Sequence, residues 1–132
     1  MTLVTRRSAF TLVELVMVIV ILGLLAAVVV PKFTDIRSQA VNAAEQGVVS
    51  AVRSGINMYH MAQLAQGNDA YPNKLDNATN GVASQTNPLF TEVIDGGVTD
   101  SNWKKTGTRT YKYLPTGNRY RYNKNTGKFE RI

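Results

Sequence analysis

A run of uncharged apolar residues near the N-terminus constrains this chain more than any other feature. Residues 15–30 read LVMVIVILGLLAAVVV, and with residues 10–13 the apolar stretch reaches roughly the twenty residues that a bilayer core requires. A single segment in lipid can satisfy its own backbone hydrogen bonds only as a helix. The sequence therefore predicts a membrane-spanning helix over residues 10–31 that begins near Thr11.

The residues before this segment indicate its orientation. Arg6 and Arg7 are the only charged residues ahead of the apolar run, and this bias favours a cytoplasmic N-terminus. The run continues through three valines with no polar cleavage site, unlike an ordinary secretory signal. Residues 5–10 also come close to a twin-arginine signal. An exported soluble binding module is therefore an alternative, although Glu14 interrupts the segment that such a signal would need.

Glu14 is an acid within an otherwise apolar stretch. On insertion scales an ionised carboxylate at the bilayer centre costs about 2.5 to 3.5 kcal/mol, so the side chain needs a partner. One partner is local, because residues 11–14 fit a capping box in which Thr11 and Glu14 satisfy backbone amides of the first helical turn. The other is a positive charge from a second copy of the chain. Cleavage between Ala9 and Phe10 would create such a charge.

Residues 10–14 (FTLVE), the apolar run that follows and residues 31–33 (PKF) resemble the N-terminal signature of type IV pilins and type II secretion pseudopilins. The resemblance implies that a prepilin peptidase removes residues 1–9 as a leader and that the new amine of Phe10 is methylated. It also implies that Glu14 pairs with that amine in a neighbouring subunit. Alanine stands at position 9, where the family usually has glycine.

The same resemblance implies the partners and the location. The subunit would be a single-pass inner-membrane protein that works with an assembly platform. It would then join other pilins or pseudopilins in a periplasmic or cell-surface filament. Filament packing in the family is often accompanied by partial melting between the positions of Gly23 and Pro31.

Beyond the membrane segment the sequence predicts that the helix continues to about residue 65. Pro31 should kink or break it. The apolar stripe consists of Ile36, Ala40, Ala44, Val48, Val52, Ile56 and Tyr59, spaced three or four residues apart. Gly47 and Gly55 lie at or beside this stripe, which suggests close approach of another segment. Residues 66–68 supply a stop signal.

The remaining residues, 66–132, should form a small head. Residues 67–109 are rich in turn-forming residues, with a short helix expected after Asn87 and Pro88 and ended by residues 95–97. Three strands follow from alternating aromatic residues: Tyr111 and Tyr113, Tyr120 and Tyr122, and Phe129. We therefore expect an α+β, pilin-like fold, with the soluble half of the helix, residues 32–65, packed against a three-stranded antiparallel sheet.

The composition argues against an enzyme. There is no cysteine and only one histidine, His60, so the commonest catalytic and metal-ligating groups are scarce. We expect no cofactor and no metal site. Calcium at Asp95 and Asp100 stays open, although turn formation is the simpler explanation of these acids.

The net charge of +6 indicates acidic partners. The basic excess is concentrated near the C-terminus, and the candidate polyanion-binding residues are Lys112, Arg119, Arg121, Lys124, Lys128 and Arg131. Alternating with tyrosines, these could bind DNA through phosphate pairing and base stacking. A minor pilin that binds DNA or surfaces is therefore a second alternative.

The leading interpretation is a structural filament subunit, either a pilin or a pseudopilin. Many pilins close a C-terminal loop with a disulfide, which this chain cannot form, and this favours a pseudopilin. However, the chain lacks the Asp-Pro-Trp-Gly stretch and acidic calcium loop expected of a typical major pseudopilin. The choice therefore stays open at this level.

Overall fold

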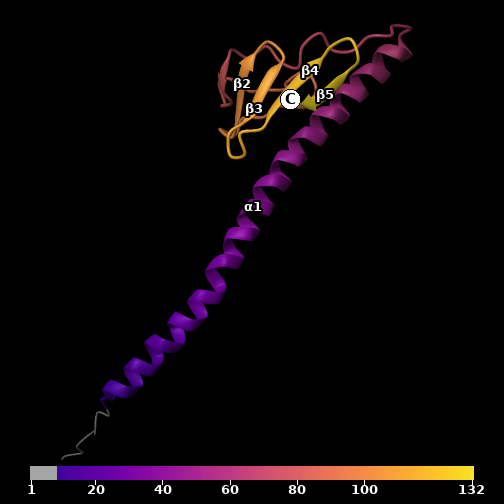
Figure 1. The fold of residues 1–132 in the computed structure, drawn as a ribbon. Coiled ribbons are helices and arrows are strands. Elements are labelled where there is room, and N and C mark those ends of the chain that lie inside the picture. Colours follow the sequence, from indigo (N-terminus) through magenta and orange to yellow (C-terminus); the bar gives the residue numbers. More distant parts are fainter. Residues whose placement is uncertain (1–8) are drawn as a thin grey trace, which may run out of the picture. The chain divides into compact units, whose positions relative to one another are not determined.

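The structure, a computed structural model, describes residues 9–132, so nearly all of the expected leader lies outside the described part (Figure 1). The chain divides into two compact units, residues 1–39 and residues 40–132. One helix, α1 (Leu12–Ala65), runs through both units. Its start and its end confirm the sequence-based expectation.

The first unit contains the N-terminal part of α1, whose side chains are exposed throughout. Pro31 does not break the helix, because the missing N–H removes only one bond from a long hydrogen-bonded ladder. The alternative, a kink at Pro31, stays a prediction. Thr34 adds a bond there, since its hydroxyl donates to the carbonyl of Val30 at 3.2 Å.

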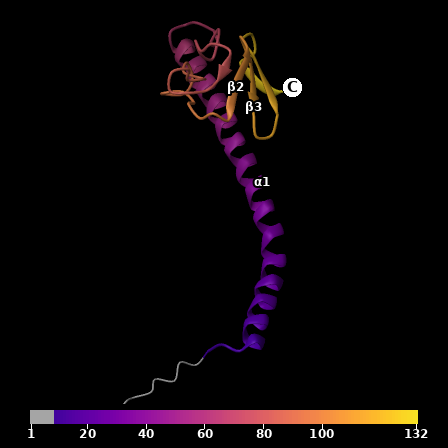
Figure 2. The ribbon, with the colours of Figure 1, turned by 90° about the vertical axis from the view of Figure 1, so that its left-hand side faces the viewer.

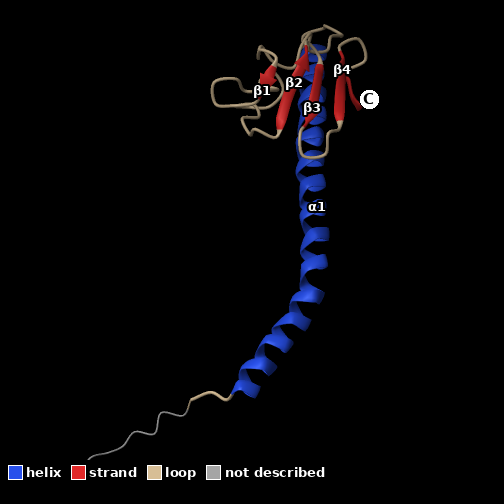
Figure 3. Ribbon diagram, turned by 60° about the vertical axis from the view of Figure 1, so that its left-hand side comes forward, coloured by secondary structure: helices blue, strands red, loops and turns tan. Residues whose placement is uncertain are grey.

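The second unit is the α+β head. Its strands are β1 (Gly81–Val82), β2 (Trp103–Gly107), β3 (Thr110–Tyr113), β4 (Arg119–Asn123) and β5 (Lys128–Arg131). They form one antiparallel sheet in the order β1-β2-β3-β4-β5. Figure 2 and Figure 3 show the sheet lying against the C-terminal part of α1. The last three strands are those predicted from the aromatic alternation.

The sequence predicts three strands where the sheet has five, because β1 and β2 fall in the segment expected to be irregular. β1 has only two residues, which leaves no period to detect. In β2 the inward positions hold Trp103 and Lys105, and a lysine at an inward position hides the alternation. The expected short helix after Asn87 is also wrong: the segment forms turns around Phe90, whose backbone is left-handed at φ 61°.

The core of the head lies between α1 and the inner face of the sheet. It consists of Val49, Val52 and Ile56 from α1, Leu75, Ala83, Leu89 and Phe90 from the loops, and Trp103, Tyr111, Tyr113, Tyr120, Tyr122 and Phe129 from the sheet. All five predicted aromatic positions in the last three strands are buried. Burial of these side chains is the main source of stability in the head.

The buried stripe of α1 differs from the expected one at its N-terminal end. Ile36, Ala40 and Ala44 are exposed, and Glu45 is buried instead. At Gly55 the predicted close approach is confirmed, because a Cβ there would lie 1.9 Å from the carbonyl oxygen of Val93. Gly47 has nothing within 4 Å of its Cβ position, so the same prediction is wrong there.

The helix ends at the predicted stop. The amide of Gly67 donates to the carbonyl of Leu64 at 2.9 Å, and that of Asn68 donates to the carbonyl of Gln63 at 2.9 Å. Gly67 has a φ of +82°, the left-handed conformation in which glycine ends helices without strain.

Candidate assembly site at the start of the helix

The first turn of α1 forms the capping box expected from the sequence. Thr11 precedes the helix and Glu14 is its third residue. One carboxylate oxygen of Glu14, Oε2, accepts hydrogen bonds from the backbone N–H of Thr11 at 2.8 Å and from its hydroxyl at 3.1 Å. The N–H of Glu14 donates to the Thr11 hydroxyl oxygen at 3.2 Å. The capping box, which is the local explanation for this acid, is therefore present in the structure.

The capping box does not use the whole carboxylate. All hydrogen bonds that the described residues donate to the Glu14 carboxylate end on Oε2, and the residue is exposed. The second oxygen, Oε1, therefore has room for a donor from outside the subunit. The local and the intersubunit explanations are compatible, because each needs a different oxygen.

The surroundings of Glu14 are apolar and exposed. A hollow beside it is lined by Phe10, Thr11, Leu12, Leu15, Met17 and Val18. Phe10 is 90% exposed and Leu12 is 78% exposed. Glu14 is the only charged residue in residues 9–31. A cation that reaches this carboxylate in lipid or in a helical bundle would meet little competition from water.

The apolar part of α1 is long and hydrophobic enough to cross a membrane, with a mean hydropathy of 3.1 over its most apolar window. None of the side chains in that window is buried in the subunit. Exposed apolar surface of this extent marks contact with lipid or with other proteins. Gly23 lies within it and has open space around its Cβ position. Melting between Gly23 and Pro31 stays a prediction.

The proposed cleavage bond lies just ahead of the helix. Ala9 and Phe10 are exposed and have no helical structure. Exposed backbone outside regular structure is where peptidases cut most readily.

The head brings together four of the six predicted basic residues. Lys112, Arg119, Arg121 and Lys128 alternate with the buried aromatics and therefore lie on the outer face of the sheet. Lys124 is in the turn between β4 and β5, whereas Arg131 lies opposite Tyr120 at the end of β5. The tyrosine rings are 0 to 3% exposed in β3 and β4. They cannot stack on bases, so that part of the DNA hypothesis is wrong.

Two buried acids in the head were not predicted from the sequence. The first, Glu45, is 1% exposed and accepts hydrogen bonds from Tyr120 at 2.6 Å, Asn118 at 2.8 Å and Thr116 at 2.8 Å. Burial alone would raise the pKa of Glu45, but these three donors, together with the positive charge of Arg131, outweigh it and hold the pKa below its usual value.

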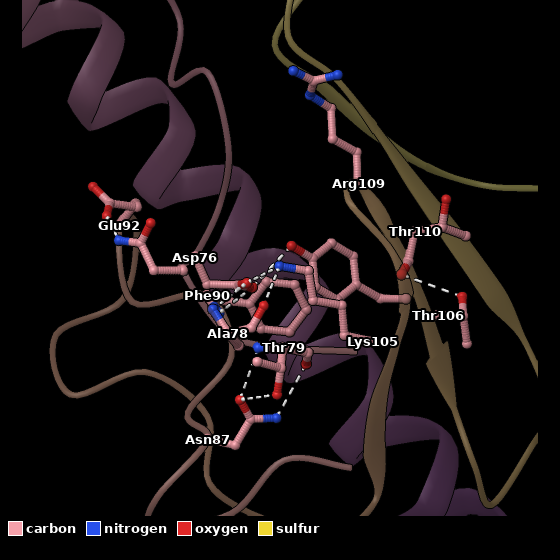
Figure 4. Close-up of polar contacts among 12 residues, drawn as sticks. Asp76, Ala78, Thr79, Asn87, Phe90, Glu92, Lys105, Thr106, Arg109 and Thr110 are labelled. Atoms are coloured by element: carbon pink, nitrogen blue, oxygen red, sulfur yellow. Dashed lines mark hydrogen bonds and ion pairs between the residues drawn. The ribbon is translucent and has the colours of Figure 1, made fainter. Parts of the chain in front are cut away.

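The second buried acid, Asp76, links the loop before β1 to the sheet (Figure 4). It accepts hydrogen bonds from Lys105 at 2.5 Å, from Tyr111 at 2.8 Å and from the backbone N–H of Phe90 at 3.0 Å. Lys105 also donates to the carbonyl of Ala78 at 2.8 Å. Burial and the neighbouring Asp76 carboxylate raise the pKa of Tyr111. The only trace of this network in the sequence is Lys105, two residues after Trp103, and it points to the network only once β2 is known to be a strand.

The remaining chemistry-bearing residues do not converge. Within residues 9–132 no group of three or more His, Asp or Glu side chains could hold a metal ion. His60 contacts Asp69 at 2.8 Å and stacks on Tyr71. Asp100 accepts a hydrogen bond from the backbone of Asn102 at 2.8 Å, which is a turn contact.

Comparison with known proteins identifies the family of the chain. Residues 4–30 match the prokaryotic N-terminal methylation motif. The type II secretion system core protein G of Pseudomonas aeruginosa is 32% identical over 118 residues, which covers 89% of this chain and 73% of that protein. Its counterpart in Vibrio cholerae is 28% identical over 114 residues, covering 86% of this chain and 75% of the relative. No solved structure matches the chain significantly.

A second kind of relative matches a shorter stretch of the chain. The type IV narrow pilus major component PilA5 of Thermus thermophilus is 49% identical over 49 residues, which covers 37% of this chain and 42% of that protein.

The long apolar helix, the small antiparallel sheet and these relatives define a pilin-like protein. The chain belongs to the family of type IV pilins and type II secretion pseudopilins. It is a structural subunit of a pilus or pseudopilus.

Proposed function

We propose that this subunit polymerises through the N-terminal part of α1, and that Glu14 pairs with the Phe10 amine of a neighbouring subunit. The carrying observation is that Thr11 occupies one oxygen of Glu14 and leaves the other available. An unpaired carboxylate is costly among apolar helices, whereas the paired one is tolerated. Pairing therefore favours one axial register between subunits.

The steps before assembly follow from the N-terminal residues. The subunit enters the inner membrane with a cytoplasmic N-terminus, favoured by Arg6 and Arg7. A prepilin peptidase then cuts between Ala9 and Phe10, and the new Phe10 amine is methylated. An assembly platform moves the subunit out of the membrane into a filament with other copies or other pilins. The subunit has no catalytic role of its own.

The proposed filament is a secretion pseudopilus. The resemblance to core protein G extends over 118 residues and includes the head, whereas the resemblance to the pilus component covers 49 residues. Similarity in the N-terminal region alone does not separate the two classes, because both use the same signature. Deleting the gene should therefore impair protein secretion and leave surface attachment intact.

Intact-mass analysis of the protein recovered from membranes tests the maturation steps. We expect loss of residues 1–9 and one added methyl group. Loss of about thirty residues would support the twin-arginine alternative and overturn the proposal. An Ala9→Gly variant is the matched control, because it restores the residue usual in the family. It should be processed at least as completely as the natural chain.

A further inference from the structure

The outer face of the sheet carries three cations in direct register. Lys104 in β2 lies opposite Lys112 in β3, and Lys112 lies opposite Arg119 in β4. We call these three residues the basic row. Like charges directly opposite each other destabilise a sheet. Their arrangement therefore calls for a compensating anion.

In the described part of the subunit, no acid forms an ion pair with the basic row. The ion pairs among residues 9–132 are His60–Asp69, Asp76–Lys105 and Lys128–Glu130. None of them includes a member of the basic row. Glu130 lies opposite Arg121, which is two residues beyond Arg119 along β4.

A complementary surface lies elsewhere on the same head. Glu92, Asp95 and Asp100 are exposed in the segment between β1 and β2, and we call them the acidic loop. Glu92 and Asp95 line a hollow together with Gly55 and Met58 of α1. The acidic loop is therefore partly seated on the helix, whereas the basic row faces away from the helix on the outer side of the sheet.

The acidic loop is held firmly in place. Leu89 and Val98 form a two-way backbone bridge with N···O distances of 2.9 and 2.7 Å. Phe90 is fully buried, and its N–H is bound by Asp76. A surface that is already ordered loses little conformational entropy on binding.

We propose that the basic row of one subunit binds the acidic loop of the next subunit in the filament. The two surfaces are different patches of one molecule, so the contact is head-to-tail, and a head-to-tail contact that does not close into a ring builds a helical filament. This inference rests on the filament function and adds a second contact, in the head, to the one at Glu14. The occupant of the basic row is a second copy of this chain.

Disulfide trapping tests the contact directly, because the natural chain has no cysteine. The full chain carrying Asp95→Cys and Arg119→Cys, oxidised in filament-forming cells, should give a ladder of dimers, trimers and larger species. The matched control carries Asp95→Cys and Lys124→Cys. Lys124 lies in the turn beyond β4, away from the basic row, and this pair should give no ladder.

Charge reversal provides the second arm. A Lys104→Glu, Lys112→Glu, Arg119→Glu variant should lower the assembled fraction about tenfold at low salt, with a smaller loss at high salt. Adding Glu92→Lys, Asp95→Lys and Asp100→Lys should restore assembly. A variant with Lys74→Glu, Lys124→Glu and Lys128→Glu changes the net charge equally and should assemble normally.

The outcomes separate this proposal from the filament function. If natural subunits form filaments but the cysteine pair gives no ladder, the head contact is wrong and the filament function stands. If natural subunits form no filaments, the filament function is wrong and this proposal falls with it. A third outcome is that the natural chain binds duplex DNA in a salt-sensitive way, the Lys104→Glu, Lys112→Glu, Arg119→Glu variant does not, and the cysteine pair gives no ladder. This result assigns the basic row to nucleic acid and overturns the proposal.

Discussion

The phenolic oxygen of Tyr120 lies 2.6 Å from a carboxylate oxygen of Glu45, and this contact ties β4 to α1. Asn118 and Thr116, from the turn before β4, complete the set of donors. Glu45 is therefore a fixed acceptor for β4 and for the turn before it. The head is held on α1 by this polar contact as well as by apolar packing.

Replacing Glu45 with alanine should lower the free energy of unfolding by about 2–4 kcal/mol, because the buried hydroxyl of Tyr120 and two half-buried donors lose their acceptor. Glu45→Gln keeps one acceptor oxygen and should cost less. Chemical unfolding of the full chain in detergent measures both, with the single, buried Trp103 as the fluorescence probe. Equal stability of the alanine variant and the natural chain would show that these hydrogen bonds contribute nothing.

Alkaline pH should destabilise the head through Tyr120. Burial and the hydrogen bond to the Glu45 carboxylate raise the pKa of this phenol from 10.0 to about 12. Because the folded pKa is the higher one, the contribution to stability is complete below pH 10 and is lost as the pH rises through about 12. The free energy of unfolding should therefore fall across this range. Tyr120→Phe should show a shallower fall, and an identical pH profile would contradict the assignment.

Removing Asp76 alone should lower the free energy of unfolding more than removing both charges of the Asp76–Lys105 ion pair. Asp76→Ala leaves the ammonium of Lys105, which is 5% exposed, without its carboxylate. The expected loss is about 3–5 kcal/mol. The double variant Asp76→Asn, Lys105→Met removes both charges and should recover most of that loss. A double variant no more stable than Asp76→Ala would mean that the ion pair is not what Asp76 contributes.

Two glycines of α1 should respond oppositely to the same substitution. Gly55→Ala places a Cβ 1.9 Å from the carbonyl oxygen of Val93. Backbone must move to relieve this clash, so we expect a loss of about 1–3 kcal/mol. Gly47→Ala meets no atom within 4 Å and should stabilise the helix by up to about 1 kcal/mol. Thermal unfolding of the two variants in parallel checks both signs.

Much of the fold could be predicted from local patterns. The helix boundaries follow from Thr11 at the start and Gly67 at the end, and the last three strands follow from alternating aromatics. These signals are strong because each depends on a residue's own neighbours in sequence. The capping box at Glu14 was visible for the same reason.

Three of the errors involve partners distant in sequence. Glu45 was not assigned to the buried stripe because a carboxylate is normally exposed, and its donors lie more than seventy residues away. Lys105 hid β2 because its acceptor, Asp76, is 29 residues earlier. The short helix after Asn87 failed because Asp76 binds the N–H of Phe90 in a left-handed turn. A buried polar residue is explained only by its partner.

The most direct test of the account is the filament yield of a Glu14→Ala chain expressed at the level of the natural chain. Sedimentation of sheared filaments measures assembly, and the membrane fraction measures the unassembled pool. We expect the variant to be inserted and cleaved but to give little or no filament. Filaments at natural yield and with the same axial stagger between subunits would contradict pairing between Glu14 and the Phe10 amine.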